Sequence, residues 1–323
     1  MIAAIVVHLE FFARPVALPV GFALVRKHSD DSSRLVLAWQ LAAALAAALA
    51  GRILQVVADS AYAGKALRHL PAAVNWTTRL RSNASLYELA PRRTGKRGRP
   101  RLKGAKLTSL ACLARSAQST LTTVTCYGTT TTVSVAVIHC LWYGVFGPQA
   151  VQVVLVRERS KTGYNVALVT TDLTSSAAQV LERYASRWSI EVAIEDAKQI
   201  VGVGQARNRL PSAVERTVPF TLAVNTLAVC WYATAGHHPD DVVTARVMAP
   251  RYRGEDPALG PRHACQAPPC HHRCPISPRG LPSPHPTGNH DPKPGLGGRR
   301  CVGEKAELPR QRDVPPGELH PTD

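Results

Sequence analysis

The stretch RYASRWSIEVAIEDAKQIVG, residues 183–202, decides how the fold is read, because it sets charged side chains into an apolar helical pattern. The spacing of its apolar residues predicts one long helix over about 176–201, and the pattern Ser176-x-x-Gln179 predicts a capping box at its start. On a helix that turns about 100° per residue, four polar residues fall within an arc of about 60°. These four residues are Tyr184, Arg187, Glu191 and Lys198. One stripe of the helix therefore presents a phenol, a carboxylate and two cations in the same direction.

This stripe has two explanations. In the first, it is a solvated face held by ion pairs four residues apart, such as Arg187–Glu191. In the second, the stripe binds a ligand. The neighbouring large apolar residues indicate that much of the helix is buried, and unpaired charges there cost several kcal/mol. A divalent cation together with a phosphate satisfies all the charges at once.

A second acid follows an apolar strand. The sequence ILQVVADSAYAG, residues 53–64, predicts a buried strand that ends just before Asp59, followed by a turn. An acid at the carboxyl end of a strand lies where α/β proteins usually bind ligands. Asp59 is also suited to a helix N-cap, which is the commoner role for an isolated aspartate.

The composition points to a polyanionic partner. The chain has 323 residues and a formal net charge of +17, a large excess for a merely solvated surface. The segment 91–106 is a basic loop in which three arginines stand around Pro100, and they are Arg97, Arg99 and Arg101. Their arrangement resembles an AT-hook core, which enters the minor groove of DNA, but a flexible solvated loop has the same composition.

The remaining features favour a cytoplasmic protein without a membrane partner. The N-terminus lacks a signal-peptide pattern, and the Ala-rich run 35–51 predicts a buried helix. Residues 250–323 hold 16 of the 25 prolines, so we expect a disordered tail. A zinc site there is the less favoured alternative, because the spacing fits no familiar zinc finger. Its candidate ligands are Cys265, Cys270, His271, His272 and Cys274.

The spacing Tyr184-x2-Arg187-x3-Glu191-x6-Lys198 resembles the Y-R-E-K signature of DDE transposases from bacterial insertion sequences. Further stretches resemble the same family, and the resemblance covers residues 1–249: VVADSAYAG (56–64), TTRLRSNASLYEL (77–89), GRPRLKG (98–104) and GVGQARNRLPSAVERTVPF (202–220). The resemblance implies that Asp59 and Glu191 hold Mg²⁺ or Mn²⁺ for DNA strand cleavage and transfer. It also implies that Tyr184, Arg187 and Lys198 contact DNA phosphates.

The same resemblance implies a fold and a domain order. We expect an α/β protein with an RNase H-like mixed sheet, flanking helices and a β-rich insertion between the second and third catalytic acids. The expected segments are the first part of the core (1–82), the insertion (83–174), the helical part of the core (175–249) and the tail (250–323). The family's first catalytic aspartate is expected on a strand upstream of residues 1–27.

No convincing substitute for that first aspartate precedes Asp59, because only Glu10, Asp30 and Asp31 do so. We therefore interpret the sequence as N-terminally truncated, with a tail read in a shifted frame. Three hypotheses remain: a transposase, inactive for lack of the first acid; a non-catalytic DNA-binding remnant; and a zinc-binding protein. The resemblance implies DNA ends and target DNA as partners, assembly as a homodimer on DNA, and a place at the bacterial nucleoid.

Overall fold

The computed structural model describes residues 1–12, 14–25, 34–92, 99–157, 163–205, 209–238 and 240–241. They belong to one compact unit, residues 1–279. The strands are β1 (Ile2–Val7), β2 (Val16–Phe22), β3 (Leu54–Ala58), β4 (Val74–Arg79), β5 (Thr120–Cys126), β6 (Thr129–Leu141), β7 (Ala150–Arg157) and β8 (Tyr164–Thr170). The α-helices are α1 (Arg34–Ala48), α2 (Leu110–Ser116), α3 (Tyr143–Phe146), α4 (Ala177–Ser186), α5 (Ser189–Gln199) and α6 (Pro211–Trp231). Shorter turns of helix are η2 (Ser60–Tyr62), η3 (Lys65–His69), η4 (Val203–Gln205) and η5 (Tyr232–Gly236).

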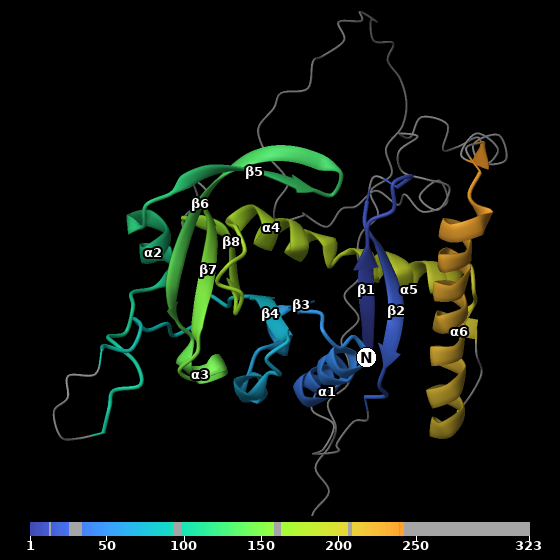
Figure 1. Ribbon diagram of the computed structural model, residues 1–323, viewed down its shortest axis with the longest axis horizontal. Coiled ribbons are helices and arrows are strands. Elements are labelled where there is room, and N and C mark those ends of the chain that lie inside the picture. Colours follow the sequence, from blue (N-terminus) through green and yellow to red (C-terminus); the bar gives the residue numbers. More distant parts are fainter. Residues whose placement is uncertain are drawn as a thin grey trace, which may run out of the picture. The chain divides into compact units, whose positions relative to one another are not determined.

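Six strands form one curled, mixed sheet in the order β3-β4-β8-β7-β6-β5 (Figure 1). The pair β3–β4 is parallel and the other neighbours are antiparallel. The strands expected in the insertion continue this sheet, because Thr77 of β4 lies opposite Thr170 of β8. The expected mixed α/β sheet with flanking helices is confirmed, while the domain boundaries at 82 and 174 stay predictions.

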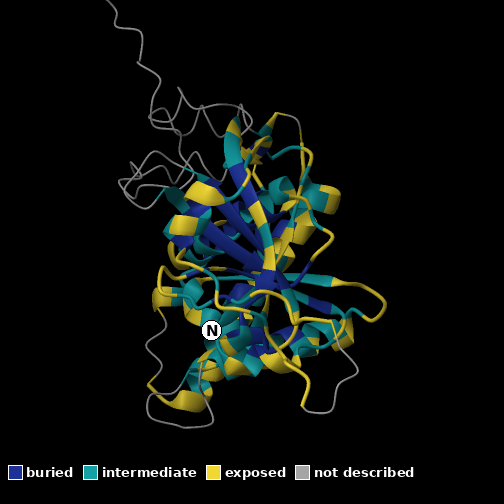
Figure 2. Ribbon diagram, turned by 90° about the vertical axis from the view of Figure 1, so that its left-hand side faces the viewer, coloured by how far each residue is buried: buried dark blue, intermediate teal, exposed yellow. Residues whose placement is uncertain are grey.

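The centre of the sheet is covered on both faces. Strands β7 and β8 carry near-continuous apolar runs, AVQVVLVR and YNVALVT, which is the pattern of strands without a solvated face. One face packs with Trp76, Leu110 and Phe146, and the other packs against α4 through Val180 and Leu181. The buried residues accordingly follow the strands in Figure 2. This packing fixes α4 against the sheet.

A second, two-stranded sheet stands apart from the first. Strand β1 pairs with β2 in antiparallel register, and β2 packs against α5 and α6 (Figure 1). Among the described residues, β1 pairs only with β2, and β3 pairs only with β4. Each of these two strands therefore has one edge without a hydrogen-bonded strand neighbour.

The predicted helix over 176–201 is wrong in one respect, because the structure divides it into α4 and α5. The capping box at its start is confirmed: the Ser176 hydroxyl accepts from the Gln179 amide, and the Gln179 side chain accepts from the Ser176 amide. Arg187 and Trp188 lie between the two helices.

The break has a local cause in the serines beside it. The hydroxyl of Ser186 donates to the carbonyl of Arg183, and that of Ser189 donates to the carbonyl of Ser186, each at 2.7 Å. The backbone tightens to bonds three residues apart, such as Trp188 N to Ala185 O at 3.2 Å. Serine hydroxyls that bond back to the helix compete with the regular ladder and bend it. The polar stripe is therefore shared between two helices.

Helix α6 exposes much of its apolar surface. Phe220, Leu227 and Trp231 are 71%, 67% and 63% exposed. By length and composition alone, Pro211–Gly236 is the described helical stretch that meets the criterion for crossing a membrane. That criterion is weak evidence, because core helices of soluble proteins also meet it. The sequence-based expectation of no membrane partner stays a prediction.

Candidate active site

Asp59 is the residue that follows β3, and its position serves two roles. Its Oδ1 accepts a hydrogen bond of 2.7 Å from the Ser60 amide, so it caps η2 as the N-cap alternative predicts. Its carbonyl accepts from the Thr78 hydroxyl at 2.9 Å, which ties the end of β3 to β4. The side chain is exposed at the end of the strand. Asp59 is thus held in place and still open to a ligand.

Glu191 lies in the first turn of α5 and forms the ion pair that the sequence allows. Its Oε1 accepts from Arg187 Nη1 at 3.0 Å. The side chains are 42% and 25% exposed, respectively, so solvent screens much of their attraction. The predicted pairing four residues apart is therefore present.

Arg187 lies beside Tyr184 and pairs with Glu191, and the charge of Asp59 also acts on it. Its Cζ lies 5.6 Å from the centre of the Tyr184 ring. Burial alone would lower the pKa of Arg187, but the charges of Tyr184, Glu191 and Asp59 outweigh it, so the pKa is raised. The pKa of Tyr184 is raised, mainly by burial and further by the charge of Asp59. The end of β3, the end of α4 and the start of α5 therefore share one electrostatic neighbourhood.

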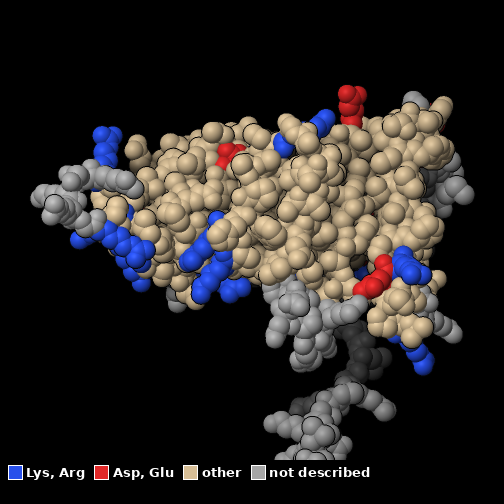
Figure 3. Space-filling view, turned by 60° about the horizontal axis from the view of Figure 1, so that its bottom comes forward, with Lys and Arg blue, Asp and Glu red and all other residues tan. Residues whose placement is uncertain are grey.

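The other residues predicted to contact DNA lie in more varied positions. Tyr184 is 7% exposed and packs in the core, with the guanidinium of Arg187 beside its ring. Lys198 is exposed in the last turn of α5, about 10 Å along the helix from Glu191. Arg99 and Arg101 are exposed, and Arg97 lies outside the described residues. On the face shown in Figure 3, basic side chains outnumber acidic ones and gather toward one end.

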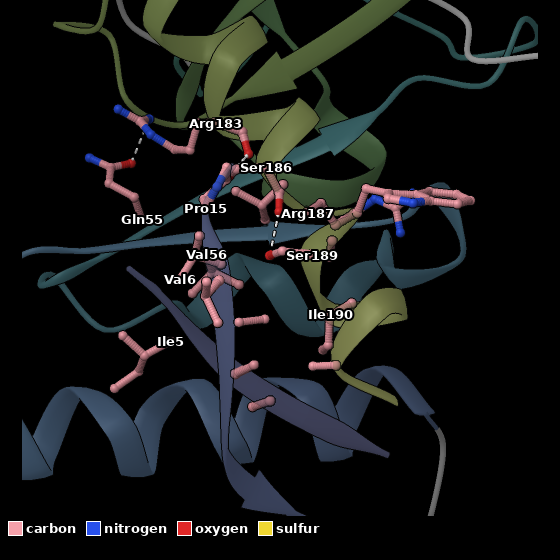
Figure 4. Close-up of a pocket in the computed structure, with 18 of the residues that line it drawn as sticks. Ile5, Val6, Pro15, Gln55, Val56, Arg183, Ser186, Arg187, Ser189 and Ile190 are labelled. Atoms are coloured by element: carbon pink, nitrogen blue, oxygen red, sulfur yellow. Dashed lines mark hydrogen bonds between the residues drawn. The ribbon is translucent and has the colours of Figure 1, made fainter. Parts of the chain in front are cut away.

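A large groove adjoins this neighbourhood. It has a volume of about 1250 Å³, and its walls come from β1, β3, α1 and the α4–α5 segment. Asp59, Arg183 and Arg187 all line it. Figure 4 shows both arginines together with Val6 of β1 and Val56 of β3. The edges of β1 and β3 that lack a strand neighbour thus border the same groove.

Residues 24–142 match the model of the DDE superfamily endonucleases. On this segment, the chain is similar to that superfamily. The matched part contains β3 and Asp59, whereas Glu191 and both helices of the polar stripe lie beyond it. No curated protein matches the chain.

The similarity to DDE endonucleases leads us to expect a metal site. DDE endonucleases act on DNA and generally use divalent metals. Among the described residues, no three or more of the types His, Cys, Asp and Glu are grouped so that they can hold a metal ion. Asp59 and Glu191 share the neighbourhood of Arg187 without a third acid, and Glu10 does not complete the set. A three-carboxylate metal site therefore does not fit the described part of this chain.

Several residues named from the sequence lie outside the described ranges. They are Asp30, Asp31, Cys265, Cys270, His271, His272 and Cys274. The zinc alternative and the expected tail therefore stay predictions.

The structure also reveals an acid that sequence reasoning missed. Asp172, just after β8, is 6% exposed, and its carboxylate accepts five hydrogen bonds, from Gln55, Thr174 and Ser175. Burial alone would raise the pKa of Asp172, but these bonds outweigh it, so the pKa is well below its usual range. Arg183 adds an ion pair at 3.7 Å.

Asp172 has a structural role in the fold. Arg183 donates to the Gln55 side chain and to the Ser175 hydroxyl, each at 3.0 Å, so one network joins β3, β8 and α4. Both carboxylate oxygens of Asp172 accept hydrogen bonds. The local signal was the sequence DLTSS, in which Thr and Ser follow an acid just before a helix. Gln55, 117 residues earlier, left no such signal.

Proposed function

We propose that this chain descends from a bacterial insertion-sequence transposase and acts as a DNA-binding protein without strand-transfer activity of its own. The observation that carries the proposal is the shared neighbourhood of Asp59, Arg187 and Glu191 beside the groove. The family match to DDE endonucleases supports DNA as the partner. The net charge of +17 favours the same partner.

The proposed roles follow from the charges. Asp59 and Glu191 are the remaining metal-binding carboxylates, and Mg²⁺ or Mn²⁺ would supply Lewis-acid chemistry at phosphorus in an intact site. Arg187 and Lys198 bind DNA phosphates, and Tyr184 supports Arg187 from the core side. Two carboxylates provide less charge and fewer ligands than three. We therefore expect metal binding too weak to support cleavage.

The cellular role follows as part of the proposal. A protein that binds transposon ends without cutting them competes with an intact transposase for those ends. It assembles as a homodimer on paired DNA ends, in the bacterial cytoplasm at the nucleoid. The alternative is an active transposase, and activity measurements separate the two.

The test uses the full chain with labelled duplex DNA, in Mg²⁺ and separately in Mn²⁺. We expect binding that weakens steeply with salt and no nicked or joined product on a sequencing gel. The variant Glu191→Gln serves as the matched control and is expected to show the same absence of product. Metal-dependent cleavage by the wild type that disappears in Glu191→Gln would contradict the proposed loss of activity.

A further inference from the structure

Two tyrosines far from the candidate active site each lie beneath a cation. Lys103 Nζ lies 4.0 Å from the centre of the Tyr87 ring and 5.2 Å from that of Tyr143. Arg68 Cζ lies 5.9 Å from the centre of the Tyr143 ring. These four residues, Arg68, Tyr87, Lys103 and Tyr143, are called here the tyrosine–cation cluster. Such contacts are weakly favourable at exposed sites and bias where a side chain lies.

The backbone holds Lys103 in this place. Tyr87 exchanges two backbone hydrogen bonds with Leu141 at the end of β6, of 2.9 and 2.7 Å. Gly104 donates to the carbonyl of Glu88 at 3.0 Å. A Cβ on Gly104 would lie 2.7 Å from both the Glu88 Cβ and the Leu89 carbonyl oxygen, so this close approach requires glycine. The C-terminal part of the basic loop is therefore fixed to the sheet.

Arg68 is fixed in a similar way. Its Nη2 donates to the carbonyls of Tyr143 and Gly144 at 3.2 and 3.5 Å. These bonds join η3 to α3 and leave the guanidinium exposed. Among the described residues, neither Arg68 nor Lys103 forms an ion pair with a carboxylate. Two positive charges are thus presented to solvent without a neutralising acid.

More cations lie on the same two segments. Lys65 precedes Arg68 on η3, and three exposed cations flank Lys103 on the loop, namely Arg99, Arg101 and Lys106. Glu88 is an exposed acid beside them. The excess remains strongly basic. A polyanion is the partner with matching charge.

The topology separates this cluster from Asp59. Strand β6 ends at Leu141. Because β7 is antiparallel to β6, this is the end of the sheet at which β7 begins, and β3 and β4 begin there as well. Asp59 follows the opposite end of β3. A strand of five residues spans about 17 Å, which corresponds to about five nucleotide steps along one DNA strand. One duplex is long enough to reach both ends.

We propose that Arg68 and Lys103, seated on Tyr143 and Tyr87, bind the phosphate backbone of duplex DNA at a distance from the candidate active site. This inference rests on the proposed function, since it takes DNA as the partner. Phosphate contact is favoured over base stacking, because a ring face that holds a cation is not available to a base. The cluster thus positions DNA without reading its sequence.

The test measures the affinity for a duplex in EDTA between 50 and 200 mM salt. For Lys103→Ala, we expect the slope of log affinity against log salt to fall in magnitude by about 0.9, and for Arg68→Ala/Lys103→Ala by about 1.8. The exposed Arg216 on α6 gives the matched control, and Arg216→Ala is expected to keep the wild-type slope. Tyr143→Phe keeps the ring and the slope, whereas Tyr143→Leu lowers it.

The outcomes separate the two proposals. If the wild type binds DNA but Lys103→Ala keeps its slope, the cluster is not a phosphate contact, and the proposed function is untouched. If Lys103→Ala lowers the slope and the wild type cuts DNA when Mg²⁺ is added, the cluster stands and the proposed inactivity fails. Lys103 is exposed, so its variant decides the question even where the Arg68 variant unfolds, which circular dichroism detects.

Discussion

Two arginines one helical turn apart, Arg183 and Arg187, each pair with a carboxylate, yet the two pairs differ in nearly every physical respect. Arg183 meets Asp172, which is 6% exposed and accepts five hydrogen bonds. Arg187 meets Glu191 through one hydrogen bond, with side chains 25% and 42% exposed. The first pair is closed to further ligands, and the second is open to them.

This difference shows that the number of partners, rather than the sign of the charges, separates a structural pair from a candidate site. A carboxylate with every oxygen satisfied joins parts of a fold and gains nothing from a metal or a phosphate. A carboxylate with one exchangeable partner can give it up at little cost. The pKa of Asp172 is strongly lowered, yet Asp172 is the less suited of the two acids to function.

Removing each acid in turn tests whether the two pairs differ in their contribution to stability. We expect Asp172→Ala to lower the free energy of unfolding by about 3 kcal/mol, because Arg183 and several donors lose a buried partner. Glu191→Ala is the matched control and is expected to cost less than about 0.5 kcal/mol. Urea denaturation of the full chain measures both. Equal losses for the two variants would show that the two pairs do not differ as proposed.

The pH dependence of stability tests the buried pair by a second route. The folded-state pKa of Asp172 lies below its unfolded value of about 4. Its stabilisation is therefore complete above pH 4 and is lost as the pH falls through that value toward the folded-state pKa. In Asp172→Asn, this part of the pH dependence should be missing, so the wild type and the variant should converge in stability below pH 4. Urea midpoints between pH 7 and pH 3 check this, and parallel curves would contradict it.

The smallest expected effect concerns the open pair itself. A double-mutant cycle with Arg187→Ala and Glu191→Ala should give a coupling energy of about 0.3–0.5 kcal/mol, since solvent screens the pair. The coupling should shrink further in high salt. A coupling above about 1.5 kcal/mol that is insensitive to salt would mean that the pair is structural after all.

The sequence predicts the strands well because their apolar runs are local. The strand expected before Asp59 corresponds to β3, and the near-continuous apolar runs AVQVVLVR and YNVALVT form β7 and β8. What it could not predict was pairing between distant parts. The pairing of β4 with β8 joins residues about 90 positions apart, and no local pattern marks it.

The candidate site was predicted in part for the same reason. The capping box of Ser176 and Gln179 is a local pattern that predicts the start of α4. The Arg187–Glu191 pair follows from helical spacing. The break at Arg187 depends on hydroxyl groups bonding back to the helix, which the apolar period does not record. The brace at Asp172 depends on Gln55, which lies in another element.

The bordering edges of β1 and β3 carry a consequence for handling the molecule. Within the described part of the chain, each of these edges lacks a strand neighbour, and such an edge is a template on which chains add to one another. The net charge of +17 opposes such association through repulsion between copies, and salt weakens that repulsion. The net charge and the strand edges therefore have opposite effects on association between copies. At low salt, repulsion keeps the copies apart and DNA binding is favoured. At high salt, DNA is released and the strand edges of different copies can pair.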